Sequence, residues 1–466
     1  MRHTNFALAL LAAAVLTACG GSSDNNNSAA QAPIPKFASQ VTFGDSLSDV
    51  GTYRVGAVAQ LGGGLYTING NNTTINAALH GKNWTQLLAT QLNLAAQCPA
   101  VTGLEGDTAR GFAVPIVQNT SCTNYAQGGA RVTNPVGPGN KLTGSILGQM
   151  TQPVVAQVAN YLARNGGAFK SSDLVIVMAG GNDALTLLGG LTAAAQAAGG
   201  AAGAKAGAET FAKNLTGYLA ATATNPATAA TAIGTAIATE SARPGSTSTT
   251  IVGAAVQAAA TQPGNTAVAS PAVYGPLVAK AQAEGAAAGA TAGAAAGAAF
   301  GAANGPALVP QMAAAGTELA NLIRTQIVGK GASYVVLNNL PDLSVSPSGR
   351  AQSASSQQLI AGMVNAFNIA LRVGIDGLES KVMYVDLATL LQDQVANPAK
   401  YGITNATTPA CGPNALGTTS LVCTSQNITS TNVGNYLFAD DVHPAPYGQT
   451  LIAKAVAEAM MARRWL

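Results

Sequence analysis

Charged side chains are scarce in this sequence of 466 residues. Lys, Arg, Asp and Glu make up 9% of it and leave a formal net charge of +3, whereas charged residues are about 25% of a typical soluble domain. No run rich in Lys and Arg is present, so the sequence gives no electrostatic support for binding nucleic acid. The five cysteines and three histidines form no cluster with the spacing of metal ligands. We therefore expect neither a metal nor another cofactor.

Four of the five cysteines, Cys98, Cys122, Cys411 and Cys423, lie well beyond the N-terminus. An even number of cysteines in an exported chain predicts two disulfides, and three pairings are possible. Pairing each cysteine with its nearest neighbour in sequence, Cys98 with Cys122 and Cys411 with Cys423, would close short loops.

The N-terminus has the features of an export signal. A positive start precedes the apolar run Phe6–Val15, which is too short to span a bilayer. Small residues then lead to Cys19 and resemble a bacterial lipobox, so we expect residues 1–19 to be a lipoprotein signal peptide and Cys19 to carry the lipid. Residues 20–37 would be a flexible tether. Gly20 is not aspartate, which by resemblance to lipoprotein sorting signals implies the outer membrane. The alternative is an ordinary signal and a secreted or periplasmic protein.

Segments typical of strands and helices alternate from residue 38 onward. The unbroken apolar run 174–178 is typical of a central parallel strand, and shorter runs at 41–43, 334–337 and 382–385 predict further strands. Residues 98–122 are predicted to be a loop. The alternation predicts an α/β fold in which helices cover both faces of a parallel sheet.

Residues 191–311 differ in kind, because Ala and Gly dominate them. Glycine recurs at every fourth position at Gly199, Gly203 and Gly207, and again from Gly285 to Gly305. On a helix this spacing makes a groove of small residues that another helix can approach closely. We therefore expect an inserted pair of helices. A disordered tract is the second alternative and a membrane span the third, since Leu, Ile and Phe are nearly absent.

A turn after the first strand places one hydroxyl at the edge of the sheet. Val41–Phe43 is the predicted strand, Gly44 and Asp45 the turn, and we expect a helix to start at Ser46. A serine there would have its N–H at the positive end of a helix, which suits a nucleophile and the oxyanion that it generates. The alternative is that Asp45 and Ser46 only cap the helix.

A serine nucleophile needs a base, and the two histidines beyond the signal peptide are the candidates. His443 follows Asp440 by three residues and Asp441 by two, so that either carboxylate could bind one ring nitrogen and leave the other free for Ser46. His80 has no carboxylate close in sequence. We therefore expect His443 to be the base and Asp440, in preference to Asp441, to orient it.

Two further segments could supply oxyanion donors. The pair Gly128-Gly129 follows a short predicted strand, where glycine lets the backbone approach a ligand closely; a plain turn is the alternative. Asn182 follows the strand at 174–178, at the edge where open α/β sheets place their ligands; the alternative there is a helix cap.

Four blocks, in this order, resemble the signature blocks of the GDSL (SGNH) esterase and lipase family: GDSL at 44–47, NYAQGGA at 124–130, GGND at 180–183 and DDVHP at 440–444. Weaker similarity at 339–343 and between residues 396 and 409 points to the secreted lysophospholipase and lecithinase-like branch. The resemblance covers residues 38–448 apart from the insertion. Each block is short, but four of them in this order are specific.

The resemblance implies an SGNH hydrolase domain over residues 38–466, interrupted by the insertion. Its fold would be the flavodoxin-like three-layer α/β/α arrangement with a five-stranded parallel sheet.

The resemblance also assigns roles to the matching residues. Ser46 would be the nucleophile and, through its N–H, one oxyanion donor; His443 would be the general base and then the acid; Asp440 would orient His443. The side chain of Asn182 and the N–H of Gly129 would be the other donors, with Gly128 as the alternative because the doubled glycine leaves the register open.

We therefore expect a serine hydrolase that cleaves carboxylic esters, in particular lipid or acyl esters, through an acyl-serine intermediate. A lipid acyltransferase, a carbohydrate deacetylase and an arylesterase on the same site are alternatives. A non-catalytic envelope lipoprotein that acts through its Ala/Gly-rich segment is the alternative from another class. The expected partners are an ester substrate and, through the lipid anchor, the membrane. No oligomeric state is predicted.

Overall fold

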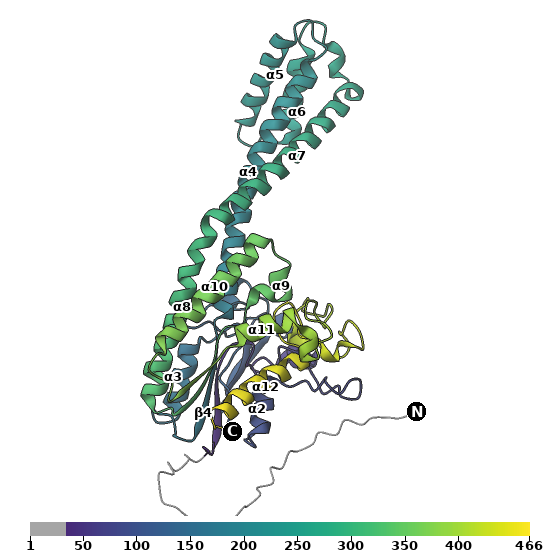
Figure 1. The fold of residues 1–466 in the computed structure, drawn as a ribbon. Coiled ribbons are helices and arrows are strands. Elements are labelled where there is room, and N and C mark those ends of the chain that lie inside the picture. Colours follow the sequence, from purple (N-terminus) through teal and green to yellow (C-terminus); the bar gives the residue numbers. More distant parts are fainter. Residues whose placement is uncertain (1–33) are drawn as a thin grey trace, which may run out of the picture.

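The computed structural model describes residues 34–466 and has a parallel sheet at its centre (Figure 1). Its four strands are, in order across the sheet, β1 (Ser39–Gly44), β4 (Asp173–Met178), β5 (Tyr334–Asn338) and β6 (Val382–Val385). Every residue of β4 is buried, as expected for a strand with neighbours on both sides and helices on both faces. The prediction of an α/β fold with a parallel sheet is confirmed.

The prediction of five strands is wrong for the described residues, since the sheet has four. Residues 123–127 lie beside β1 where the fifth strand was expected: Tyr125 N–H donates to Thr42 O at 2.8 Å and Gln127 N–H to Gly44 O at 3.1 Å. Only one bridge to β1 forms there, between Thr42 and Asn124, and a second bridge joins Asn124 to Pro99. The segment is too short for a regular strand because a disulfide at Cys122 precedes it and a glycine turn follows it.

Helices cover both faces of the sheet and give the molecule three layers. One face is covered by α3 (Val154–Arg164), α8 (Leu308–Leu322) and α10 (Ala354–Gly374), and the other by α2 (Trp84–Gln91) and α12 (Pro446–Ala462). Alternate side chains of β4 point to opposite faces. Val175 and Val177 therefore join the first core, and Leu174, Ile176 and Met178 the second.

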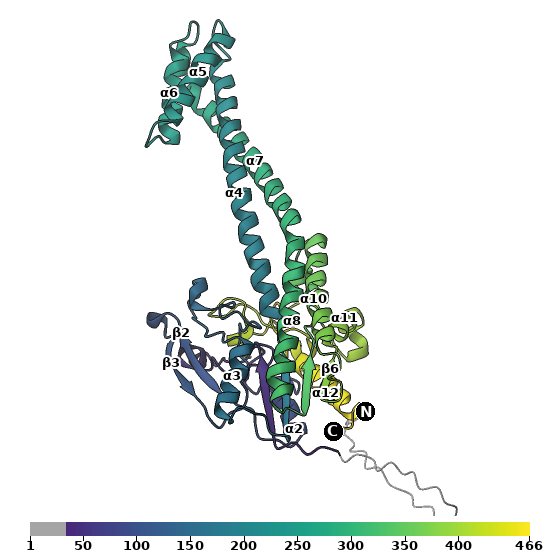
Figure 2. The same ribbon diagram turned by 90° about the vertical axis from the view of Figure 1, so that its left-hand side faces the viewer.

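The remaining α-helices and strands of this body are short. They are α1 (Gly56–Gln60), α9 (Pro347–Arg350), α11 (Leu387–Ala396) and an antiparallel hairpin of β2 (Val101–Glu105) and β3 (Ala113–Gln118), which lies at the side of the body in Figure 2. The loop predicted for residues 98–122 is therefore wrong. The hairpin gave no clear apolar alternation because five of the six residues of β3 are exposed and the sixth is half-buried, on a surface strand that contains Pro115.

The Ala/Gly-rich residues form a long helical arm that projects from the body (Figures 1 and 2). The arm consists of α4 (Gly181–Ala220), α5 (Pro226–Ser241), α6 (Ser248–Ala260) and α7 (Pro271–Asn304). The two longest helices, α4 and α7, form the shaft, and α5 and α6 lie at the far end. We call this far end the tip; its own apolar core includes Leu215, Ile233, Ile237, Ala255 and Ala281. Residues 191–311 are therefore mainly helical, as expected, and do not form the disordered tract that was the alternative.

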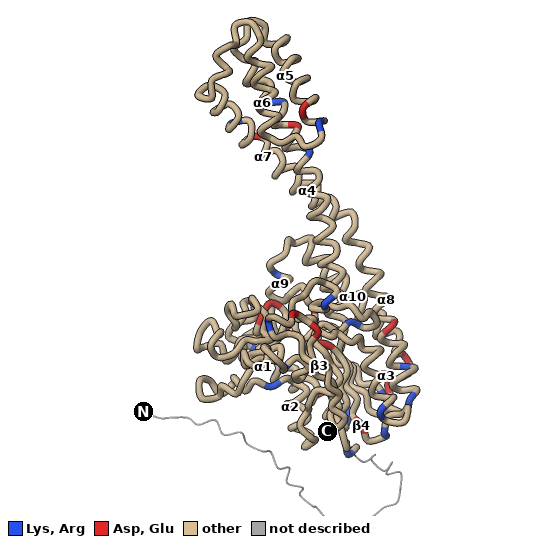
Figure 3. The backbone as a smooth tube through the Cα atoms, turned by 180° about the vertical axis from the view of Figure 1, so that it is seen from behind, with Lys and Arg blue, Asp and Glu red and all other residues tan. Residues whose placement is uncertain are grey.

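Glycine allows the two shaft helices to touch along their backbones. A Cβ atom added at Gly203 would lie 2.8 Å from Gly289 O, and one at Gly199 would lie 2.7 Å from Gly293 O. The shaft is also nearly free of charge (Figure 3), because residues 184–204 and 285–317 contain no Lys, Arg, Asp or Glu. By length and composition alone, the helical run Pro271–Lys330 could cross a membrane.

Candidate active site

The structure brings Ser46, His443 and Asp440 together at the carboxyl edge of the sheet. Ser46 Oγ lies 2.8 Å from His443 Nε2, although 397 positions separate the two residues in sequence. His443 Nδ1 lies 2.8 Å from Asp440 Oδ2 and 2.9 Å from Oδ1. The Ser46 residue is 8% exposed and the His443 side chain 14%, so the pair is reachable from solvent but largely shielded from it.

Ser46 lies in a turn, and the helix expected to start there is absent. Ser48 N–H donates to Asp45 O at 3.1 Å, and Leu47 N–H donates to the Asp45 carboxylate at 3.0 Å. The next helix, α1, begins only at Gly56. The Asp45 side chain captures the N–H of Leu47 and stabilises a local turn, so the argument from a helix dipole does not apply to Ser46.

Asp440 is buried and accepts hydrogen bonds on both carboxylate oxygens. Oδ2 accepts from Ser420 N–H at 2.7 Å, and Oδ1 accepts from the N–H groups of Val442 and His443 at 3.0 and 2.8 Å. Burial disfavours the charged carboxylate, but the charge of His443 and these hydrogen bonds outweigh it and hold the pKa of Asp440 well below its ordinary value. Asp440 is therefore an ionised, fixed partner for the imidazole.

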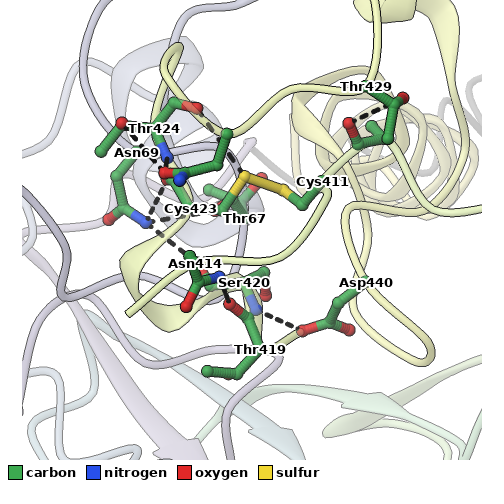
Figure 4. Close-up of a disulfide and its surroundings, with 12 residues drawn as sticks. Thr67, Asn69, Cys411, Asn414, Thr419, Ser420, Cys423, Thr424, Thr429 and Asp440 are labelled. Carbon is green, nitrogen blue, oxygen red and sulfur yellow. Dashed lines mark hydrogen bonds between the residues drawn. A yellow bond between two sulfur atoms is a disulfide. The ribbon is translucent and has the colours of Figure 1, made fainter. Parts of the chain in front are cut away.

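A disulfide supports the loop that holds Asp440. Figure 4 shows Ser420 beside Asp440 and the Cys411–Cys423 bond close by. The Asn69 side-chain amide donates to Ser420 O and Cys423 O, both at 3.1 Å. The second disulfide joins Cys98 to Cys122. The two bonds are those of the nearest-neighbour pairing, and they are consistent with export.

The Gly128-Gly129 turn presents one free amide. Gly128 N–H donates to Asp49 Oδ2 at 2.9 Å and is therefore occupied. Gly129 has φ of +80°, a left-handed conformation that suits glycine. Within the range 34–466, neither Gly129 N–H nor Ser46 N–H has a hydrogen-bond acceptor. Of the two glycines, Gly129 is thus the one with a donor to offer.

Asn182 lies in the first turn of α4, directly after β4. Its side-chain Nδ2 donates to Ala130 O at 2.9 Å, and the amide has a second hydrogen for a ligand. The neighbouring Asp183 accepts from Val132 N–H and from Arg131 Nε, both at 3.0 Å. These contacts fix the loop after Gly129 against the start of α4.

Two residues at the site, Tyr66 and Asp49, were missed from the sequence, and Asp45 was expected only as part of a turn or a helix cap. Tyr66 packs on the imidazole of His443, with ring centroids 4.7 Å apart, and a Cβ atom at Gly128 would lie 2.0 Å from its hydroxyl. Asp49 stabilises the glycine turn by accepting the hydrogen bond from Gly128 N–H. Asp45 is buried, which raises its pKa to about 7. In the sequence, only the pair Gly128-Gly129 indicated that another group, here the Tyr66 hydroxyl, comes close to the backbone.

The other candidates lie elsewhere. The His80 ring forms a hydrogen bond with Thr450 Oγ1 at 3.0 Å and accepts one from Lys82 N–H. The carboxylate that bonds to the His443 ring is that of Asp440 and not that of Asp441. Cys19 lies outside the described residues.

Comparison with known proteins shows similarity to one family over part of the chain. Residues 41–266 match the family model described as GDSL-like Lipase/Acylhydrolase. This match and the similarity to GDSL esterases support that family for the matched part of this chain. The matched residues include Ser46, Gly129 and Asn182, whereas Asp440 and His443 lie beyond them.

Two relatives illustrate the extent of the similarity. The GDSL esterase/lipase APG of Arabidopsis thaliana is 29% identical over 141 residues, which cover 28% of this chain and 40% of that protein. Esterase EstA of Pseudomonas aeruginosa is 32% identical over 132 residues, 26% of this chain and 19% of that protein. The chain thus spans less than half of the length of these relatives.

Proposed function

We propose that this protein hydrolyses carboxylic esters with Ser46 as the nucleophile, His443 as the base and then the acid, and Asp440 as the group that orients His443. The single observation that carries the proposal is the 2.8 Å contact between Ser46 Oγ and His443 Nε2, on an imidazole whose Nδ1 is held by a buried carboxylate. This is the arrangement that serine hydrolases of unrelated folds use to activate a hydroxyl.

In the first step, Ser46 Oγ attacks the ester carbonyl carbon while its proton passes to His443 Nε2. The carbonyl oxygen becomes an oxyanion, for which the free N–H groups of Ser46 and Gly129 and the Asn182 amide are the proposed donors. The C–O bond to the alcohol then breaks. The alcohol leaves with the proton from His443, and the acyl group stays on Ser46.

In the second step, water attacks the acyl carbon and gives a proton to His443 Nε2. The bond to Ser46 Oγ breaks, the proton returns to Ser46, and the carboxylic acid departs. Asp440 keeps its charge throughout and stabilises the imidazolium that forms in both steps.

A largely apolar cavity, lined in part by the sequence neighbours of Ser46 and His443, supports an acyl ester as substrate. Its volume is about 50 Å³, and its lining includes Leu47, which follows Ser46, and Val442 and Pro444, which flank His443. Leu343, Leu390, Leu391, Phe438 and Ile452 complete most of its apolar wall. We propose that this cavity receives the acyl chain. The resemblance to the lysophospholipase and lecithinase-like branch adds lipid esters to the proposed substrates.

Labelling with a fluorophosphonate tests the proposal. The reagent should modify the wild-type protein at Ser46, as mapped by peptide mass, and should abolish hydrolysis of p-nitrophenyl butyrate. Ser46→Ala should neither be labelled nor turn over the ester, while its circular dichroism spectrum stays that of the wild type. Labelling at another serine, or full turnover by Ser46→Ala, would exclude this mechanism.

We also propose that the protein is exported and anchored by a lipid on Cys19. The lipobox-like residues before Cys19 and the two disulfides support this proposal. Labelled palmitate should enter the wild type and not Cys19→Ala, and equal incorporation into both would contradict it.

A further inference from the structure

One aromatic ring packs on the proposed base. The centroids of the Tyr66 and His443 rings lie 4.7 Å apart with an angle of 34° between the ring planes, an arrangement closer to stacked than to edge-on. Tyr66 is 7% exposed. In both steps of the proposed reaction His443 takes up a proton and becomes a cation. Because the face of an aromatic ring carries negative potential, it attracts a cation beside it, and the attraction grows where water is excluded.

The Tyr66 ring is also held at its hydroxyl end. The Gln149 side-chain amide donates to Tyr66 Oη, and Gln149 is itself fixed because its N–H donates to Gly139 O at 2.8 Å. A Cβ atom at Gly128 would lie 2.0 Å from Tyr66 Oη and 2.4 Å from Cζ, so the ring is in contact with the backbone of the glycine turn. Tyr66 therefore contacts both the base and the turn of the proposed oxyanion donors.

The loop that carries Tyr66 is joined to the loop that holds Asp440. The Asn69 side-chain amide donates to Thr67 O, directly after Tyr66, and to Ser420 O, both at 3.1 Å. Ser420 N–H in turn donates to Asp440 (Figure 4). The phenol ring and the carboxylate are thus held by connected backbone, the ring against the imidazole and the carboxylate at its Nδ1.

The hydroxyl of Tyr66 keeps its proton. Burial above all raises the pKa of this phenol well above its ordinary value, and the nearby carboxylates of Asp49 and Asp440 raise it further. The phenol therefore neither supplies nor takes a proton in a hydrolysis near neutral pH. What it offers to His443 is the face of its ring.

We propose that Tyr66 is a positioning residue of the hydrolase, and that its ring stabilises the imidazolium of His443 as this forms in the transition states of acylation and deacylation. The inference rests on the proposed function. The neutral imidazole of the resting enzyme gains less from the ring than the imidazolium does, so the contact lowers the barriers without strengthening substrate binding. Its loss should therefore lower kcat and leave KM unchanged.

Rings of graded electron density at position 66 test the proposal. The variants are Tyr66→Phe, two further proteins with 4-fluorophenylalanine or 3,4,5-trifluorophenylalanine there, and Tyr66→Leu. Fluorine withdraws electron density from the ring face and changes the size of the ring little. For p-nitrophenyl butyrate we expect Tyr66→Phe to keep kcat within about twofold and Tyr66→Leu to lose about three- to thirtyfold, with little change in KM. The fluorinated variants should lie between these two, in the order of their fluorine content.

The same series at Tyr334 is the matched control. Tyr334 is the first residue of β5, at the opposite edge of the sheet from Ser46, and packs on Phe37 and Trp465, so fluorination there should leave kcat unchanged. Should Tyr66→Leu fold poorly, the fluorinated series decides, since each member keeps the ring.

Fluorophosphonate labelling separates this inference from the function on which it rests. Complete labelling of Ser46 in each variant shows that the site is intact. Labelled variants whose kcat does not depend on fluorination, or in which KM alone changes, would overturn the role of Tyr66 and leave the hydrolase in place. A wild type that is neither labelled nor active would remove the proposed hydrolase and this inference with it.

Discussion

At the scale of single residues, three carboxylates hold the groups around Ser46 in place. Asp440 accepts from three backbone N–H groups besides the imidazole, Asp49 holds Gly128, and Asp183 holds Val132. Each of these bonds fixes backbone or ring orientation near the proposed oxyanion position. Because such preorganised donors need no rearrangement during the reaction, they can contribute more than the same groups would in water.

The first residue-scale prediction concerns Asn182. Asn182→Ala should lower kcat for p-nitrophenyl butyrate by about 100- to 1000-fold, the usual cost of losing one oxyanion donor. The melting temperature, followed by circular dichroism, should change little, since only one side-chain hydrogen bond is lost. Thr186→Ala, one turn further along α4, is the matched control and should keep wild-type turnover. Unchanged turnover in Asn182→Ala would remove this residue from the oxyanion hole.

The second residue-scale prediction concerns the stability of the protein at different pH values. Burial raises the pKa of Asp45 from 3.8 to about 7 in the folded state. Below pH 3.8 the carboxyl is protonated in both states; as the pH rises towards 7, the unfolded chain loses the proton first, so the free energy of unfolding falls. The slope from this group is up to about 1.4 kcal/mol per pH unit.

Asp45→Asn removes that titration and keeps an acceptor for Leu47 N–H. In guanidinium unfolding, the stability of the variant relative to wild type should therefore be larger at pH 8 than at pH 5. A difference that is the same at both pH values would show that Asp45 titrates normally.

The sequence predicted the residues of the proposed site that the structure brings together, but it did not predict the residues that support them. Ser46, Asn182 and His443 lie in short motifs, and the scarcity of histidine narrowed the choice of base. Asp49 binds a backbone N–H, and Tyr66 packs on the ring of His443. Neither role requires a fixed distance in sequence from another residue, so no sequence motif reveals it. The choice of Gly129 over Gly128 likewise depends on which N–H the Asp49 carboxylate occupies.

At the scale of elements, strong local patterns were predicted well. The apolar run of β4 gave a buried strand, since a strand covered on both faces needs apolar residues at every position. The β2–β3 hairpin was missed because it is a surface ribbon, and the helix expected at Ser46 was replaced by a turn that the Asp45 side chain stabilises. In both cases tertiary or side-chain contacts overrode the local signal.

The element-scale prediction compares two glycines of α4. A Cβ atom at Gly203 would lie 2.8 Å from Gly289 O, whereas one at Gly200 would have open space around it. Gly203→Ala should therefore push the shaft helices apart and speed hydrogen–deuterium exchange in residues 195–210 and 285–297. Gly200→Ala should slow exchange there, since alanine stabilises a helix interior by about 0.5–1 kcal/mol relative to glycine. Equal effects of the two substitutions would contradict the close backbone contact.

At the scale of the whole molecule, the tip is a separate unit of packing. Its apolar cluster contains no residue of the two cores that cover the sheet. Gly207 and Gly285 lie in contact near the base of the tip, where a Cβ atom at Gly207 would be 3.1 Å from Gly285 O. A short linker could therefore join Gly207 to Gly285 without straining the body.

Replacing residues 208–284 by a short Gly/Ser linker should leave the body folded. Turnover of p-nitrophenyl acetate should stay within about twofold of wild type, because distant sites without shared partners act independently. The two cores should melt as in the full chain, as measured by calorimetry. A large loss of turnover in a folded variant would show that the tip contributes to the site.

The continuity of α4 has a mechanical consequence. The helix has 40 residues, hence a length of about 60 Å at 1.5 Å per residue, and Asn182 lies in its first turn. A small change in the direction of the helix at its root therefore becomes a sideways displacement many times larger at its outer end. The few contacts that fix the first turn of α4, those of Asn182 and Asp183, thus set where the tip lies relative to the body.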